Sequence, residues 1–343
     1  MTAFFAIAII FVANQLQAGS QGIEKVFFDK SFPVQSMANL IINQETGSIT
    51  CENWDKNEIS VKLTAVVETN DQEKAEQEFN RVIWNITGNR KEVSVNCKLA
   101  PKRNNKNKIS VHLKLEIFMP RQVNLDLKQK YGDAFVATVD GTANITSEYG
   151  SINVNALNAA ENKFKVDYGK GHINHFESGD IYINYSGFSL YSTKKADMSS
   201  KYSKIKINNA GTLQLELEGG TVNIDSVGRF EGTVKYSTIN IKELANTMSL
   251  NTSYGNVSVS LIHNGFEELS VINKYGTVNL NISENATYSI DAEMEYCTLN
   301  YPEPLAKFNY RVKTTSSSVY RGIIGKGTEP RSKVNIQSKY GNV

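Results

Sequence analysis

The sequence predicts an all-β fold, a parallel β-helix of about twelve coils behind a β-rich N-terminal cap that contains one α-helix. Two observations carry this prediction. A tyrosine-centred triplet recurs through the last two-thirds of the 343-residue chain, and apolar residues alternate with polar ones on both sides of it. The composition agrees, because Val, Ile, Thr and Tyr, which favour strands, are abundant and there are only six prolines.

The triplet marks the units of a repeat. Lys-Tyr-Gly occurs at 130–132, 274–276 and 339–341, and close variants stand between these positions. Most successive tyrosines are 17 to 21 residues apart. A period of this length is typical of a solenoid, and it leaves room for strands and bends but not for helices. The repeat tyrosines are Tyr131, Tyr149, Tyr168, Tyr185, Tyr202, Tyr236, Tyr254, Tyr275, Tyr296 and Tyr340.

Two longer intervals are expected to hold units without a leading tyrosine. The interval of 34 residues after Tyr202 equals two units of 17, with Gly219-Gly220 at its midpoint. The interval of 44 residues before Tyr340 should divide near Ser317-Ser318 into units of about 21 and 23. The repeat domain is therefore predicted to span residues 121–343.

Alternation inside each unit predicts which side chains face the core. The third and fifth residues after the tyrosine are usually apolar, as at Ile239 and Ile241, and another apolar residue lies four positions before it, as at Leu250. We expect short strands that stack on those of the next coil at about 4.8 Å, with these residues inward. The polar residues between the apolar pairs should face outward and form a candidate ligand face: Asn153, Ser189, Lys206, Asn223, Asn240, Ser258 and Asn279.

Residues 19–120 are predicted to form the cap. A change to helical spacing, with Ala75 and Phe79 among the apolar positions, predicts one amphipathic helix at about 71–84, capped by Asn70 or Asp71. The basic segment 101–108 is interpreted as a solvated hairpin tip. The expected strands lie at 25–28, 39–43, 48–51, 58–67, 92–99 and 109–118.

The N-terminal residues 1–18 are predicted to be a signal peptide, because residues 2–13 form an uncharged apolar run that is too short to span a bilayer. We therefore expect export to the periplasm, to the outer cell surface or to the medium. No later apolar run is long enough for a transmembrane helix. The formal net charge of +2 gives no electrostatic signature of nucleic-acid binding, and the sequence leaves the oligomeric state open.

The row of tyrosines has two interpretations. Outward rings would form a stacked strip that could hold sugar rings or a peptide, whereas inward rings would be packing. The tyrosine has the parity of the inward residues before it, so packing is the prediction. The small residue that follows is usually Gly but is Ser at 186, 203 and 237 and Cys at 297, so the backbone there need not be left-handed in every coil; we attribute the small residue to a tight corner where coils approach closely. The outward polar row is therefore the preferred ligand face, although its asparagines could instead hydrogen-bond to one another as a structural ladder.

The chemically reactive residues form no convincing site. Cys51 and Cys97 could form a disulfide in an exported protein, but two buried thiols are preferred. His172 and His175 lack nearby companion ligands, so no metal or cofactor is expected. The four aspartates considered as catalytic groups differ in their offset from the tyrosine and should not converge, so we predict that the protein is not an enzyme. These aspartates are Asp133, Asp167, Asp180 and Asp225.

The chain resembles the putative-adhesin family of exported bacterial β-helix proteins, common in Bacteroidetes. The resemblance rests on the turn at Trp54–Glu58, the helix that follows it, and the segment 123–128 that leads into the tyrosine coils. Together with the predicted export signal, the solenoid and the lack of a catalytic cluster, it favours a non-enzymatic adhesin or envelope scaffold whose partner would be a glycan or a surface protein. Two alternatives remain: a polysaccharide-active lyase or hydrolase, and a periplasmic envelope-stress scaffold with a protein partner.

Overall fold

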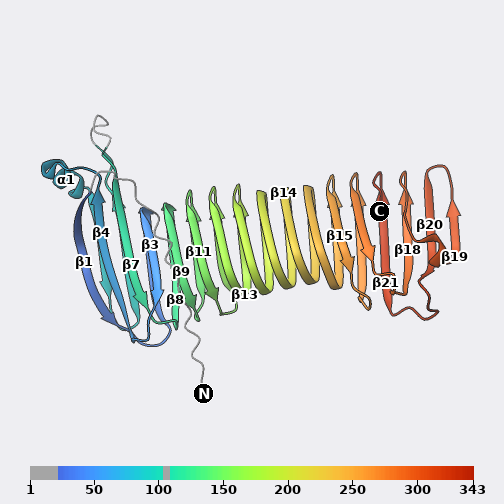
Figure 1. The fold of residues 1–343 in the computed structure, drawn as a ribbon, viewed down its shortest axis with the longest axis horizontal. Helices are drawn as coiled ribbons and strands as arrows, with labels where there is room; N and C mark the ends of the chain where they lie inside the picture. The colour runs from blue at the N-terminus through green and yellow to red at the C-terminus, as the bar shows by residue number, and fades with distance from the viewer. Residues whose placement is uncertain (1–21, 103–108) are drawn as a thin grey trace, which may run out of the picture.

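The structure is a computed structural model that describes residues 22–102 and 109–343. The predicted signal peptide and most of the basic segment at 101–108 lie outside the described residues. The chain forms a long rod of stacked strands with an α-helix at its N-terminal end (Figure 1). None of the helices in the described ranges is long and apolar enough to cross a membrane.

The elements are almost all strands. The N-terminal part contains β1 (Ile23–Pro33), β2 (Ala38–Thr46), β3 (Ser48–Asn53), β4 (Glu58–Val67), α1 (Gln72–Phe79), β5 (Val82–Gly88), β6 (Glu92–Leu99) and β7 (Val111–Met119). The coils follow as β8 (Val123–Tyr131), β9 (Asp133–Val139), β10 (Ala143–Glu148), β11 (Ser151–Leu157), β12 (Asn162–Asp167), β13 (Lys170–Asn184), β14 (Gly187–Ser253), β15 (Asn256–Ile262), β16 (Glu268–Lys274) and β17 (Thr277–Ile282). The C-terminal end contains β18 (Tyr288–Glu295), the 3₁₀ turn η1 (Glu303–Leu305), β19 (Ala306–Lys313), β20 (Ser317–Ile324) and β21 (Ser332–Lys339).

Each coil contributes one strand before its tyrosine and one after it, and each strand pairs in parallel with the equivalent strand of the next coil. Before the tyrosine, β8 pairs with β10 and β10 with β12. After the tyrosine, β9 pairs with β11 and β11 with β13. β14 continues through several coils without a break (Figure 1). The fold is therefore the all-β solenoid that the repeat predicts, and the number of coils stays a prediction.

The two rows of parallel strands that form the coils continue into the N-terminal part, before residue 120. β2 pairs in parallel with both β6 and β8, and β3 pairs in parallel with both β7 and β9. Antiparallel strands then complete this end, where β1 pairs with β4, β4 with β7, and β5 with β6. The predicted domain division at residue 120 thus marks a change in connectivity, while the hydrogen-bonded ladders continue across it.

The helix is shorter than predicted. Asp71 is the N-cap, and its side chain accepts hydrogen bonds from the N–H groups of Glu73 and Lys74, as the side chains of favoured N-cap residues do. The helix ends at Phe79, which is buried. The predicted end near residue 84 is wrong, because Val82 and the residues after it form β5 and pair with β6. Their β-branched side chains suit a strand as well as a helix face.

The C-terminal end departs from the predicted order of coils. β21 lies between β16 and β18 and is parallel to both (Figure 1). β20 is antiparallel to β18 and to β19. The predicted division near Ser317-Ser318 into two ordinary units is therefore wrong: these residues start an antiparallel strand after a turn closed by Thr314, whose N–H donates to the Ser317 carbonyl oxygen at 2.8 Å.

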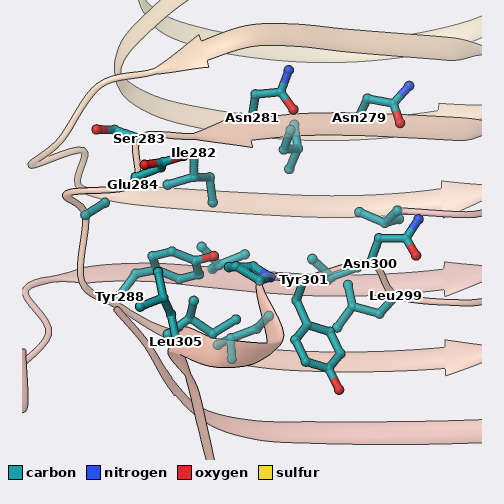
Figure 2. A pocket seen from close by; sticks show the side chains of 18 residues that line it. Asn279, Asn281, Ile282, Ser283, Glu284, Tyr288, Leu299, Asn300, Tyr301 and Leu305 are labelled. Carbon is teal, nitrogen blue, oxygen red and sulfur yellow. The ribbon is translucent and has the colours of Figure 1, made fainter. Parts of the chain in front are cut away.

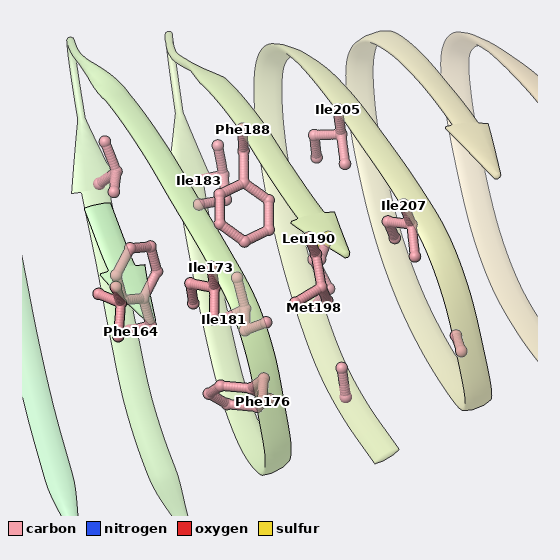
Figure 3. Close-up of a cluster of buried hydrophobic side chains, with 14 of the residues drawn as sticks. Phe164, Ile173, Phe176, Ile181, Ile183, Phe188, Leu190, Met198, Ile205 and Ile207 are labelled. Carbon is pink, nitrogen blue, oxygen red and sulfur yellow. The ribbon is translucent and has the colours of Figure 1, made fainter. Parts of the chain in front are cut away.

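The core is a set of aliphatic and aromatic rows inside the coils. Ile239 and Ile241 are fully buried, as are the equivalent residues of neighbouring coils. Figure 3 shows Phe164, Phe188 and Ile173 in the interior between the two rows of strands. The predicted inward positions are confirmed throughout the middle of the rod. Leu280 is the exception, because it is half-buried at a cavity near the C-terminal end.

Candidate functional site

The tyrosine itself turns the chain at the coil corners. Its backbone is left-handed, with φ between 49° and 56°, in nine of the coils: at Tyr149, Tyr168, Tyr185, Tyr202, Tyr236, Tyr254, Tyr275, Tyr296 and Tyr340. The first corner differs, because there the positive φ of 139° falls on Gly132. The tyrosine N–H groups connect coils; that of Tyr168, for example, donates to the Asn184 carbonyl oxygen at 3.1 Å.

The tyrosine rings face outward, so the predicted packing of these rings in the core is wrong. Their exposed fractions range from 44% for Tyr340 to 66% for Tyr236. Side chains alternate between the two sides of a strand only while the backbone is extended. The left-handed residue interrupts this alternation, and the side chain therefore leaves the corner on the solvent side.

The exposed rings stack on one another along the rod. Neighbouring ring centroids are 4.9–5.4 Å apart, with interplanar angles of 3–23°. Stacked aromatic pairs contribute about 0.5–1.5 kcal/mol each, which offsets part of the roughly 1–3 kcal/mol that an unusual backbone conformation costs. Because each ring covers the face of its neighbour, the row presents ring edges and hydroxyl groups to solvent. We call this row the tyrosine strip.

The small residue after the tyrosine is explained by close approach between coils, as predicted. A Cβ atom on Gly150 would lie 1.8 Å from the Gly132 carbonyl oxygen, and one on Gly169 would lie 2.1 Å from that of Gly150. Where Ser203 stands instead, its hydroxyl donates to the Lys201 carbonyl oxygen at 2.7 Å. Cys297 follows the same pattern, with its Sγ 3.3 Å from the Ser338 carbonyl oxygen.

The predicted ligand face lies beside the tyrosine strip, on the strands that follow the corners. Parallel register places Asn240 beside Ser258, and Ser258 beside Asn279. Part of the row is held by internal hydrogen bonds: Asn240 Nδ2 donates to Asn223 Oδ1 at 2.9 Å. Farther along, His172 Nδ1 lies 2.6 Å from the hydroxyl of Ser189, which is beside it in register. The remaining members are Asn153, which is exposed, and Lys206, which is also exposed.

The histidines and aspartates are engaged in separate local contacts. His172 Nε2 lies 2.7 Å from Asn174 Oδ1, and His175 Nδ1 lies 3.0 Å from the Ser192 hydroxyl. Asp167 pairs with Lys165 at 2.7 Å, and Asp133 accepts a hydrogen bond from the Ser151 N–H group. Across 22–102 and 109–343, no three His, Cys, Asp or Glu side chains are grouped as metal ligands.

Asp225 is held by an ion pair and a hydrogen bond. Its carboxylate lies 2.5 Å from Lys242 Nζ and accepts a hydrogen bond from Asn208. The hydrogen bond from Lys242 is the main reason that the pKa of Asp225 is lower than its ordinary value. Asp180, in turn, lies on β13, in a different coil.

The two N-terminal cysteines are free and buried, which confirms the preferred interpretation over a disulfide. Cys51 lies on β3 and Cys97 on β6. Burial raises the pKa of each thiol to about 12. Because the thiolate is the reactive form, these groups are suited to packing and not to nucleophilic chemistry.

Two hollows were not foreseen from the sequence. One, of about 590 Å³, opens at the C-terminal end between β17 and the segment before β19, and Figure 2 shows Tyr288, Leu299 and Leu305 among the side chains that line it. The other, of about 670 Å³, lies over β5, β6, β2 and β8 and includes Ile83 and Lys128. Both occur where strand order departs from chain order, which a repeat period does not encode.

Several solved structures resemble the chain at low identity. A putative adhesin from Parabacteroides distasonis is 12% identical with a TM-score of 0.38, and the match covers 76% of this chain and 99% of that one. A putative adhesin from Parabacteroides merdae is 11% identical with a TM-score of 0.32, over 78% and 94% of the two chains. A putative lipid binding protein from Parabacteroides distasonis is 13% identical with a TM-score of 0.28, over 77% and 94%.

The comparison of sequences gives a family assignment. No curated protein matches the chain. The family model described as Toastrack DUF4097 matches residues 167–343, which is just over half of the chain and includes most of the tyrosine coils. The chain therefore belongs to the Toastrack DUF4097 family.

Proposed function

We propose that this protein is an exported, non-catalytic rod that binds glycans or envelope proteins along one side, as an adhesin or a cell-envelope scaffold does. The observation that carries the proposal is that the tyrosine strip and the polar row lie side by side and follow the same coil spacing. The tyrosines lie at the coil corners and the polar residues lie on the strands that follow them, so both rows repeat along the rod with the spacing of the coils. A surface with this regular spacing suits an extended partner with a repeated structure.

The rigidity of the rows supports this function. Their side chains stand on backbone that is hydrogen-bonded to both neighbouring coils, so little conformational entropy is lost when a partner binds. A partner that contacts several coils also gains from multivalency, because each further contact forms at a high effective concentration. Weak individual contacts can therefore add up to stable attachment.

The test compares the purified rod with a variant of the polar row. The variant carries Asn223→Ala, Asn240→Ala and Asn279→Ala, and its control carries alanine at Thr233, Ser249 and Asn251, which lie on the strands before the corners. Binding to a glycan array and to isolated cell envelopes is measured for each protein. We expect the first variant to bind at least about tenfold more weakly than the control variant.

Export is tested separately by fractionating cells that produce the full chain with a C-terminal tag. We expect the protein outside the cytoplasm and shortened by about 18 residues, as a signal-peptide cleavage near that position would produce. A rod that binds no array glycan and no envelope, and whose deletion leaves cell attachment unchanged, contradicts the proposed function.

A further inference from the structure

The tyrosine strip is interrupted in its middle by a missing ring. Stacking runs from Tyr131 to Tyr202 and again from Tyr236 to Tyr296, but no ring contact joins Tyr202 to Tyr236 within the described strip. The coil between them has Gly219 at its corner, with a left-handed φ of 70° like that of the tyrosines. The corner is thus intact, and it lacks only the side chain. We call the space above Gly219 the ring gap.

The coils on both sides of the ring gap stack normally. A Cβ on Gly220 would lie 2.2 Å from the Ser203 carbonyl oxygen, the same close approach that the other corners make. Tyr202 and Tyr236 are therefore two coil spacings apart, about 10 Å, which is room for one more ring between them. Other rings in the strip occupy a space of this size.

The two rings that flank the gap have faces that no tyrosine covers. Tyr236 is 66% exposed, whereas Tyr254, which has a ring on each side, is 51% exposed. Tyr202 leans over the gap, since its Cδ1 lies 2.7 Å from the position of a Cβ on Gly219. This ring belongs to a flexible exposed side chain, so it can swing back to admit another ring.

Lysines lie on both of the coils that flank the ring gap. Lys201 is paired with Glu218 at 3.0 Å, which neutralises one charge at the edge. Lys204 and Lys235 are exposed on opposite sides of the gap, and neither has a side-chain partner in the described part of the chain. Lys206, a member of the predicted ligand face, lies two residues beyond Lys204 on the same strand. A ligand here should therefore carry negative charge.

We propose that the ring gap binds a uronic-acid unit of an acidic polysaccharide. The sugar ring inserts between Tyr202 and Tyr236, with its C–H faces against the two aromatic faces, and its carboxylate is neutralised by Lys204 and Lys235. This inference rests on the proposed function and names the ligand and the place where it is held. Elsewhere in the strip most ring faces cover one another and are unavailable for stacking on a sugar. The ring gap is a place in the strip where such stacking can occur.

The test measures binding of tri-galacturonate to the full chain by titration calorimetry. Gly219→Tyr fills the gap and should weaken binding at least about tenfold. Gly219→Ala adds the same left-handed Cβ without a ring, so Tyr202 only has to swing back as it does when a sugar enters, and this variant should bind like the wild type. The methyl ester of the trisaccharide, which keeps the rings and removes the charge, should bind more weakly to the wild type, and added salt should weaken the binding of the acid.

A second variant keeps the inference testable if Gly219→Tyr fails to fold. Tyr254→Gly opens another gap, between Tyr236 and Tyr275, which is flanked by Lys235 and Lys274. We expect it to raise the stoichiometry from one to two trisaccharides per chain. Equal affinity of the wild type and Gly219→Tyr, or an unchanged stoichiometry in Tyr254→Gly, overturns the inference. If the rod binds other glycans in that case, the proposed function stands without it.

Discussion

The middle of the rod and its C-terminal end use the same repeat but order their strands differently. From β12 to β16 each coil pairs in parallel with the next coil along the chain. At the C-terminal end β21 lies between β16 and β18, and antiparallel strands follow. This difference shows that the alternation of apolar and polar residues determines which side chains face the core. The order of the strands depends instead on pairing between distant segments.

The largest expected effect tests the in-and-out assignment in the middle of the rod. Replacing both Ile239 and Ile241 by Asp places two carboxylates in a fully buried row, and we expect the free energy of unfolding to fall by more than about 4 kcal/mol. Asn240→Ala loses one exposed hydrogen bond to Asn223 and should cost about 1 kcal/mol or less. Urea unfolding followed by circular dichroism measures both; equal tolerance would contradict the assignment.

A core truncation in each region sharpens the comparison. Ile336→Ala in β21 and Leu250→Ala in β14 both remove a buried side chain, and each should cost about 2–5 kcal/mol. Hydrogen exchange should distinguish them. Ile336→Ala should speed exchange in β18, β20 and β21 and leave β12 protected, since each coil contacts only its neighbours. Faster exchange in β12 would mean that the two regions unfold as one unit.

The close approach at the corners predicts a smaller effect. Gly150→Ala puts a Cβ 1.8 Å from a carbonyl oxygen of the preceding coil, and the backbone must shift, at a cost of about 1–3 kcal/mol. Gly187→Ala is the matched control, because the nearest atom to its Cβ is Lys170 Cγ at 3.9 Å, and it should change stability by less than about 0.5 kcal/mol. Thermal unfolding of the two variants checks this; similar melting temperatures would argue against close coil contact.

The smallest expected effect is the pH dependence of the Asp225–Lys242 ion pair. The pKa of Asp225 is lowered in the folded state, mainly by the hydrogen bond from Lys242, so the pair stabilises the fold above the ordinary aspartate pKa near 4. That contribution is lost as the pH falls through the folded-state pKa. Asp225→Asn should therefore be slightly less stable than the wild type at pH 6 and equally stable at pH 2. A difference that persists at pH 2 would rule out the ion pair as its source.

Much of the solenoid could be predicted from the sequence because side chains along each strand alternate between the core and the solvent. Ile239, Ile241 and Leu250 are buried where the alternation places them. The direction of the tyrosine rings could not be predicted in this way, since one left-handed residue reverses the parity and tyrosine rarely adopts that backbone. The candidate ligand residues lie on the strands that follow the corners, and their role in binding stays a prediction. The ring gap could not be predicted, because it depends on tyrosine rings that face outward, whereas their parity predicts that they face inward.

The remaining differences come from choices that local sequence leaves open. Val82 and Ile83 fit the apolar face of a helix, and only their pairing with Leu99 and Lys98 makes them a strand. The position of β21 is likewise defined by its parallel pairing with β16 and β18, which are distant in the sequence or reached out of chain order. In both cases, pairing with a distant segment of the chain overrides the local structural preference.

The placement of β21 has a consequence for the order of assembly during synthesis. Coils up to β16 can close one after another as the chain emerges, because each strand finds its partner already in place. β18 cannot take its final neighbour until residues 332–339 have been made, since β21 separates it from β16. Growth of the rod by simple addition therefore stops after β17, which still pairs with β15. β18 and the strands paired with it can join the rod only when β21 has been made, whose partners in β16 lie about 65 residues earlier in the chain.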